Sequence, residues 1–346
     1  MKRFLLFSVL VIAGMALTTS CKTASQQMQI LKPAAITMPS SVKQLGIINR
    51  SLPAEGQGLK NFLEGFVTGE SIGADREGSM QCVRGLASGL NNGPRFTAVV
   101  IEGVDYRGTG TAQWPEFLDW NNVDELCNRF RVDAIIALET FDSDISLDKR
   151  SADVERVIDK QKVVVKEYYA DLRMRVRSGW TVYSPGDKQI VDRNGFSDEM
   201  RWNGSGDSPQ QALNKLPAKR KAINESGFYS GNQYAYRISP SWFTENRVYF
   251  KSGNDDFKAA HKLVKKGRWQ EAVPIWNKLS ASPDTETAGR ACYNMALASE
   301  MEGKLDLAYE WASRAWQQHH LKKSRYYINI LSNRINQQKQ LDLQMQ

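Results

Sequence analysis

The sequence of 346 residues predicts an α/β (α+β) domain with a mixed sheet, followed by an all-α helical repeat. Two observations indicate the first domain. Short apolar runs alternate with segments of helical spacing as far as residue 138, and a stretch of alternating polar and apolar residues comes later. A third observation, small residues that recur at a fixed offset, indicates the repeat. A hydrophobic content of 41% is sufficient for such cores, and four cysteines are too few for a disulfide scaffold.

The amino-terminal segment has the features of a secretion signal. Lys2 and Arg3 are positive, residues 4–17 are apolar, and small hydroxyl residues precede Cys21. This arrangement resembles bacterial lipoproteins, in which the Cys sulfur receives a diacylglycerol and the Cys amine is acylated after cleavage. The resemblance implies that residues 1–20 are removed and that Cys21 anchors the chain in a membrane. An ordinary secretory signal or a true anchor helix are the alternatives.

The residues after Cys21 bear on the side of the membrane. Bacteroidota-type lipoproteins that are exported to the cell surface resemble one another in carrying acidic residues soon after the Cys. Here residues 22–27 contain no acid. We therefore expect an outer-membrane lipoprotein that faces the periplasm, with residues 21–32 as a linker. No nucleic acid is expected as a partner, because the sequence carries no motif for binding it.

Residues 33–250 are expected to form the α/β domain. The predicted strands cover residues 33–39, 44–49, 96–101, 132–138, 170–177, 189–196 and 247–250. The predicted helices cover residues 77–90, 123–130 and 218–236, and the last of these is expected to break near Gly227 or Gly231. A further helix is expected to begin near residue 208. The turn at residues 184–187 predicts an antiparallel hairpin. Cys82 and Cys127 are expected to be buried thiols, with a disulfide between them as the alternative.

The carboxy-terminal third is expected to be a helical repeat over residues 254–335. Its repeated residues are Ala260, Gly267 and Ala272 in the first unit and Ala296, Gly303 and Ala308, each 36 residues later, in the second. Each unit reads as helix, glycine turn and helix, which resembles tetratricopeptide repeats. A further helix after Leu321 is expected to close the repeat, and the Gln-rich residues 336–346 are expected to form a flexible tail.

The architecture also resembles known lipoproteins. The pattern of strands at residues 46–48, 95–99 and 132–136 is similar to periplasmic α/β domains of the curli-transport type and the TolB-amino-terminal type. The segments Arg237–Trp242 and Arg247–Phe250, followed by the repeat, resemble a Bacteroidota lipoprotein family with a lipobox, an α/β domain and a tetratricopeptide-like tail. This resemblance implies an architecture and a location, and no activity.

Charge is concentrated in the repeat. Residues 251–346 hold 15 Lys and Arg against 10 Asp and Glu, whereas residues 21–250 hold 29 against 28. Lys262, Lys265, Lys266 and Arg268 gather at the end of the first helix. They either complement the carboxyl end of that helix or contact anionic lipid headgroups or an acidic partner.

The sequence offers few residues for chemistry. All three His lie in the repeat, so the α/β domain lacks a Ser-His-Asp or Cys-His set, and no metal or cofactor motif occurs. Two groups remain as candidate ligand-binding residues: Glu139, Asp142 and Asp144 in an expected acidic loop over residues 139–148, and Arg173, Arg175 and Arg177 on the basic face of a strand.

These observations favour a non-enzymatic, membrane-anchored envelope lipoprotein that acts as a protein–protein interaction or adaptor module. Its protein partners would bind the helical repeat, and it would be held at the membrane through the lipid on Cys21. The alternative is an envelope enzyme, or a glycan- or anion-binding protein, that uses the acidic loop or the arginine face.

Overall fold

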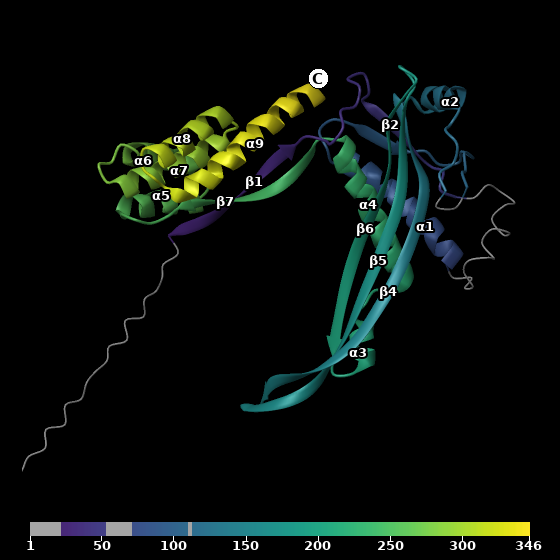
Figure 1. Ribbon diagram of the computed structural model, residues 1–346, viewed down its shortest axis with the longest axis horizontal. Helices are drawn as coiled ribbons and strands as arrows, with labels where there is room; N and C mark the ends of the chain where they lie inside the picture. Colours follow the sequence, from purple (N-terminus) through teal and green to yellow (C-terminus); the bar gives the residue numbers. More distant parts are fainter. Residues whose placement is uncertain (1–21, 53–70, 110–112) are drawn as a thin grey trace, which may run out of the picture. The chain divides into compact units, whose positions relative to one another are not determined.

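The computed structural model describes residues 22–52, 71–109 and 113–346. They divide into two compact units. The α/β unit consists of the described residues of 30–243 together with residues 337–346. The helical unit consists of residues 22–29 and 244–336. A mixed-sheet α/β region is therefore followed by an all-helical region, as the sequence predicts (Figure 1).

The α/β unit is built on a five-stranded sheet with the order β3-β2-β4-β5-β6. Its strands are β2 (Gln44–Asn49), β3 (Thr97–Val100), β4 (Ala134–Ile158), β5 (Gln161–Ser184) and β6 (Gln189–Gly206). Strand β2 pairs in parallel with both β3 and β4, whereas β4, β5 and β6 pair antiparallel. The predicted hairpin is confirmed as the β5–β6 connection.

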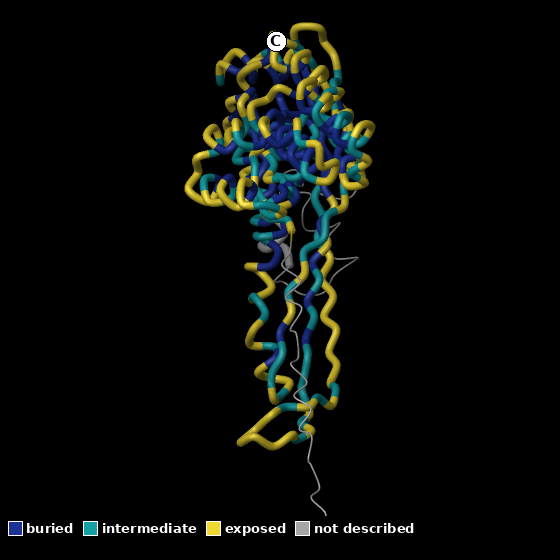
Figure 2. Tube along the Cα trace, turned by 90° about the vertical axis from the view of Figure 1, so that its left-hand side faces the viewer, coloured by how far each residue is buried: buried dark blue, intermediate teal, exposed yellow. Residues whose placement is uncertain are grey.

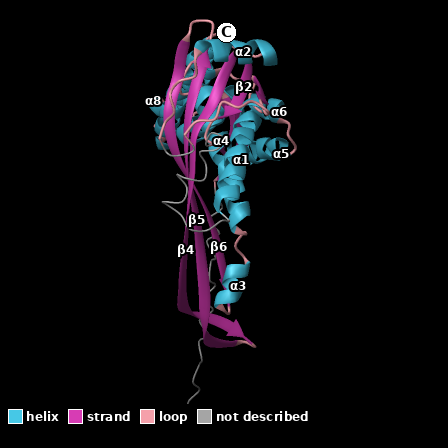
Figure 3. Cartoon of the chain, turned by 90° about the vertical axis from the view of Figure 1, so that its right-hand side faces the viewer, coloured by secondary structure: helices cyan, strands magenta, loops and turns pink. Residues whose placement is uncertain are grey.

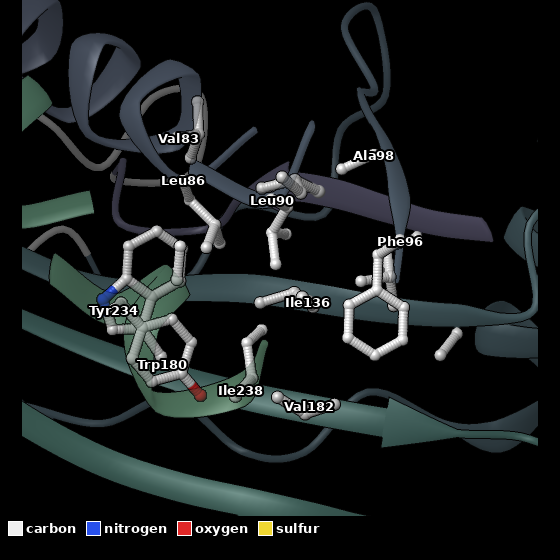
Figure 4. Close-up of a cluster of buried hydrophobic side chains, with 14 of the residues drawn as sticks. Val83, Leu86, Leu90, Phe96, Ala98, Ile136, Trp180, Val182, Tyr234 and Ile238 are labelled. Carbon is white, nitrogen blue, oxygen red and sulfur yellow. The ribbon is translucent and has the colours of Figure 1, made fainter. Parts of the chain in front are cut away.

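Helices cover both faces of the parallel part of the sheet. Helices α1 (Ser71–Asn91) and α4 (Lys219–Ile238) cover one face, and α2 (Trp120–Phe130) covers the other. The neighbours Ile47 and Ile48 belong to these two different cores, because successive strand residues point to opposite faces. Figure 4 shows the first core, in which the rings of Trp180 and Tyr234 stack with centroids 4.9 Å apart.

Helices α1 and α4 approach each other closely at glycines. A Cβ on Gly231 would lie 1.8 Å from the carbonyl oxygen of Cys82, and one on Gly85 would lie 2.0 Å from that of Phe228. The expected break of the helix near Gly227 or Gly231 is therefore wrong. Helix α4 is continuous, and its glycines lie where a neighbouring backbone leaves no room for a side chain.

Strand β4 changes character after its first five residues. Its register against β5 shifts between Leu138 and Thr140, which marks a β-bulge at Glu139. Before the bulge β4 lies between β2 and β5 in the buried sheet. Beyond Leu138, no strand in the described part of the chain pairs with the outer edge of β4.

The strands β4 and β5 continue past the rest of the sheet as an arm. Strand β6 pairs with β5 only as far as Tyr168, so residues 152–167 form a ribbon of two strands. The short helix α3 (Pro209–Asn214), capped by Ser208 as predicted, packs on β5 and β6 near the base of this ribbon (Figure 3). Much of the arm is exposed (Figure 2).

The helical unit contains the five expected helices. They are α5 (Asp255–Lys265), α6 (Trp269–Leu279), α7 (Thr285–Met301), α8 (Leu305–Gln317) and α9 (Lys322–Gln344), of which α9 contributes its residues up to Asn336. The two repeated glycines have φ values of 75° for Gly267 and 76° for Gly303, a conformation that favours glycine. Trp276 is fully buried in the core of this unit.

A buried carboxylate lies inside the helical unit. The side chain of Glu300 is fully buried and accepts hydrogen bonds at 3.1 Å from Arg247 Nε and Nη2, at 2.5 Å from the Tyr327 hydroxyl and at 2.7 Å from Arg334 Nη1. Burial raises the pKa of Glu300, but these hydrogen bonds outweigh burial and hold it below its usual value. The network joins α7, α9 and β7 (Ser241–Phe250).

Two expectations for residues 21–39 are wrong. The expected linker contains strand β1 (Thr23–Lys32), which pairs with β7 in a two-stranded sheet. Its polar residues alternate with Ala24, Met28 and Ile30, which pack inward, and the many glutamines obscured this pattern. Residues 33–39 form no strand, because the two prolines that bracket them have no N–H group for a ladder.

The expected flexible tail is also wrong. Helix α9 continues to Gln344, whose side chain is fully buried in the α/β unit. Gln344 Oε1 accepts from the Ala34 N–H at 2.8 Å, and its Nε2 donates to the carbonyl oxygens of Ala34 at 3.1 Å and Ile36 at 3.2 Å. An amide side chain thus satisfies a backbone segment that has no strand partner.

Candidate functional site

The expected acidic loop is a strand. Asp142 and Asp144 lie on β4 and share a face with Arg177 of β5. Arg177 Nε donates to Asp142 Oδ2 at 3.1 Å, and its Nη2 lies 2.7 Å from Asp144 Oδ2. The hydrogen bond with Asp142 and the two acidic charges raise the pKa of Arg177. Arg177 is therefore paired with both Asp142 and Asp144 across the ladder.

The other two candidate arginines are paired as well. Arg173 forms an ion pair with Asp148, and Arg175 Nη2 lies 3.2 Å from Glu199 Oε2 on β6. All these side chains are at least partly exposed, and exposed pairs contribute little to stability. Their arrangement gives a mixed-charge face rather than a site selective for a cation or an anion.

Glu139 is separated from the other acids by the bulge and lies in the interior. Its Oε2 is 2.7 Å from Arg50 Nη1, and its Oε1 accepts from the Tyr183 hydroxyl at 2.8 Å. Burial raises the pKa of Glu139, and the Arg50 charge and the Tyr183 hydrogen bond oppose it only in part. Arg50 also donates to the carbonyl oxygens of Tyr106 at 2.9 Å and Glu116 at 3.1 Å. This network holds the backbone at Tyr106 and Glu116, two residues that lie between β3 and α2.

A crevice of 490 Å³ opens at the carboxyl ends of β2 and β3, where ligands bind in many α/β folds. Its charged residues come from α1 and from the segment after β3. Arg84 lies 3.3 Å from Glu102, and Arg107 lies 3.2 Å from Asp105. The sequence pointed to the carboxyl ends of the strands but selected residues of β4. Asn49, the last residue of a predicted strand, lines the crevice and was not among the predicted site residues.

A second hollow, an open groove of 730 Å³, follows the exposed side of α4. It combines aromatic and amide side chains with a single acid and no basic residue. The lining residues are Gln81, Met200, Asn224, Glu225, Phe228, Tyr229, Asn232, Gln233 and Tyr236. This lining suits a neutral polar ligand better than an ion.

The arm carries the two most exposed large apolar side chains among the described residues of the α/β unit. Val157 and Val164 are each 70% exposed, and Ile158 at the tip is 50% exposed. Val157 lies opposite Lys162, so Val157 and Val164 are diagonal neighbours on one face of the ribbon. A two-stranded ribbon is at best marginally stable alone in water, and exposed apolar side chains on it indicate a contact surface.

The described cysteines offer no reactive group. Cys82, Cys127 and Cys292 are free and buried, which favours inert thiols. Burial raises the pKa of Cys127 to about 12, and it raises that of Cys82 further. Cys21, the expected lipid attachment site, lies outside the described residues.

The described residues contain neither a cluster of metal ligands nor a membrane-spanning helix. No group of three or more His, Cys, Asp or Glu is placed to hold a metal ion. No helix in residues 22–52, 71–109 and 113–346 has both the length and the apolar character needed to cross a membrane.

The fold and its surfaces define a class: an α/β domain with a long antiparallel arm, joined to a helical unit. Residues 42–250 match the domain of unknown function DUF8603, and the chain belongs to this family. Residues 258–333 match a second domain of unknown function, DUF6340. Among curated proteins, none matches the chain.

Two solved structures are similar to parts of the chain. One is a Helicobacter pylori protein described as a neuraminyllactose-binding hemagglutinin homolog, with a TM-score of 0.27 and 9% identity over 67% of this chain and 94% of the other. The other is a dodecamer of a PelC point variant from Paraburkholderia phytofirmans, with a TM-score of 0.18 and 9% identity over 61% of this chain and 99% of the other.

Proposed function

We propose that this protein is a lipid-anchored envelope protein, on the periplasmic side of the outer membrane, that acts as a non-enzymatic adaptor by binding other proteins. The observation that carries the proposal is the β4–β5 arm, with Val157 and Val164 exposed on one face. The outer edge of β4 beyond Leu138 supports it, because no strand of the described residues pairs there and another chain could add one.

The helical unit supplies a second protein-binding surface in this proposal. Two helix pairs, an offset of 36 residues and left-handed glycines at Gly267 and Gly303 support a tetratricopeptide-like repeat. Helix α9 would act as its closing helix. Repeats of this kind present helix faces to peptides or proteins.

The anchor is supported by the short distance along the chain between Cys21 and the fold. Strand β1 begins at Thr23, and the Lys251 N–H donates to the Lys22 carbonyl oxygen at 3.0 Å. A lipid on Cys21 would therefore hold the helical unit close to the membrane. Replacement Cys21→Ala should release the protein from membranes washed at high salt, which removes electrostatic contacts. A variant that stays bound after this wash would contradict the anchor.

The arm can be tested by site-specific photocrosslinking in intact cells. A benzoylphenylalanine at position 164 is expected to give discrete protein adducts, because Val164 lies in the proposed contact surface. The same residue at position 99 serves as the matched control, since Val99 is also an exposed strand valine, 43% exposed, outside the arm. Equal adducts at both positions, or none at position 164, would refute the proposal.

The alternative function through the acidic residues or the arginine face is disfavoured by their mutual pairing. The groove along α4 supports a different second candidate, binding of a neutral glycan, because aromatic rings and amides suit sugar faces and hydroxyl groups. Glycan-array binding that disappears in Tyr229→Ala but persists in Val157→Ala would establish it. If no glycan on the array binds the protein, this second candidate function is refuted.

A further inference from the structure

A basic patch lies on the helical unit where the described chain begins. We define the basic patch as Lys22, Lys251 and Lys323, with Tyr326 beside them. The backbones of Lys22 and Lys251 are hydrogen bonded at 3.0 Å, and Lys323 Nζ lies 5.9 Å from the ring centroid of Phe250, the residue before Lys251. Contacts within one unit therefore bring together the residue before β1, the residue after β7 and a residue of α9.

The patch retains a positive charge after its nearby acids are counted. Glu286 lies 3.8 Å from Lys22 Nζ, but it also forms an ion pair with Arg290. Of the two acids that open α5, Asp255 is paired with Lys258 at 2.9 Å. The Lys22 side chain is 65% exposed, so solvent or a membrane surface can reach it.

An aromatic side chain adds a second feature of a membrane interface. Tyr326 follows Lys323 by three residues on α9, so both lie on the same side of the helix, and Tyr326 is 72% exposed. Tyrosine is enriched at the level of lipid headgroups, because its ring is apolar and its hydroxyl is polar. Lysines near an anionic membrane surface are attracted to it.

We propose that the basic patch binds anionic phospholipid headgroups of the membrane that holds the lipid on Cys21. This inference rests on the proposed acylation of Cys21. Lys22 is the next residue in the chain, so the acyl chains would enter the bilayer beside the patch. One covalent and one electrostatic contact would then fix which side of the helical unit faces the membrane, and two such signals give stable attachment.

The patch is tested without the lipid on a chain that begins at position 21 with Cys21→Ser. We expect this chain to sediment with vesicles of phosphatidylglycerol and phosphatidylcholine, and not with phosphatidylcholine alone. One lysine changes the partition of a protein between vesicles and solution roughly fivefold. The triple variant Lys22→Gln, Lys251→Gln, Lys323→Gln should therefore bind the vesicles roughly a hundredfold more weakly. High salt should have a similar effect.

A matched variant removes the same charge elsewhere. Lys160→Gln, Lys166→Gln, Lys215→Gln changes three exposed lysines of the α/β unit and should leave vesicle binding within about twofold of the parent chain. Equal losses in the two triple variants would overturn the proposal, and so would binding that ignores the anionic lipid.

The native chain separates failure of the patch from failure of the anchor. A photocrosslinking residue at position 326 should yield phospholipid adducts in membranes, and one at position 309, an exposed tyrosine of α8, should not. Membrane-bound protein without adducts at position 326 would overturn the patch while leaving the anchor intact. Native protein that carries no lipid, but whose Cys21→Ser chain still prefers anionic vesicles, would overturn the anchor and support the patch.

Discussion

The replacement Glu300→Gln should destabilise the helical unit by about 3 kcal/mol. The amide has nearly the same volume as the carboxylate, so no cavity forms. Arg334 loses the counter-charge of Glu300, and Arg247 keeps only Glu245, at 3.5 Å. Removing one partner of a buried ion pair costs about 3–5 kcal/mol. We take the lower end because the arginine side chains are 9% and 15% exposed, which lets water relieve part of the charge.

Hydrogen exchange measures this loss in the right part of the chain. At neutral pH, amides of α7 and of the first half of α9 should lose protection by roughly a hundredfold in Glu300→Gln. The matched control is Glu302→Gln, two residues further on, where the side chain is 29% exposed and bonded to Lys304 and Gln270. Its effect should stay within about 0.5 kcal/mol.

The pH dependence gives an independent check. The folded pKa of Glu300 lies below its unfolded value of about 4.3, so its contribution is fully present above that pH and is lost as pH falls through the folded pKa. The difference between parent and variant should therefore shrink below about pH 4. A loss smaller than about 1 kcal/mol at neutral pH, or a loss that does not change with acid, would refute the reasoning.

Three further changes test the packing of the α/β unit. Gly231→Ala should lower the free energy of unfolding in urea by about 2–3 kcal/mol, because its Cβ meets the Cys82 carbonyl. Gly186→Ala should be nearly neutral, because no atom lies within 4 Å of its Cβ. Equal effects of the two changes would contradict the close contact at Gly231. Gln344→Ala should cost about 2 kcal/mol and raise hydrogen exchange at residues 34–36, and unchanged exchange there would argue against the buried amide. Val164→Asn should leave stability within about 0.5 kcal/mol, since the side chain is 70% exposed, and a larger loss would mean that the arm is packed.

The elements that the sequence predicts well are those with strong apolar periodicity. Strand β2 and helices α1 and α2 bury one or both faces, so their apolar residues recur with the period of the element. Strand β4 beyond the bulge lacks such a regular apolar pattern, because both of its faces are largely exposed there. Its acids at Asp142, Asp144 and Asp148 therefore resembled a polar loop.

Contacts between segments far apart in the sequence explain the remaining differences between the predicted and the observed structure. The Gln-rich end of α9 has few apolar residues, and only a partner some 300 residues away makes Gln344 a buried residue. The candidate acids and arginines could be identified separately from the sequence. Their pairing depends on the register between β4 and β5, which local composition does not reveal.

The bulge at Glu139 limits how the arm can vary in length. It reverses the alternation of β4, so that Asp142 and Asp144 meet the arginines while Ile145 and Leu147 lie on the opposite face. Deleting one residue between Thr140 and Ile145 would move both hydrophobic side chains onto the charged face. Deleting two would restore the faces. Variants of this arm should therefore tolerate changes of two residues per strand far better than changes of one.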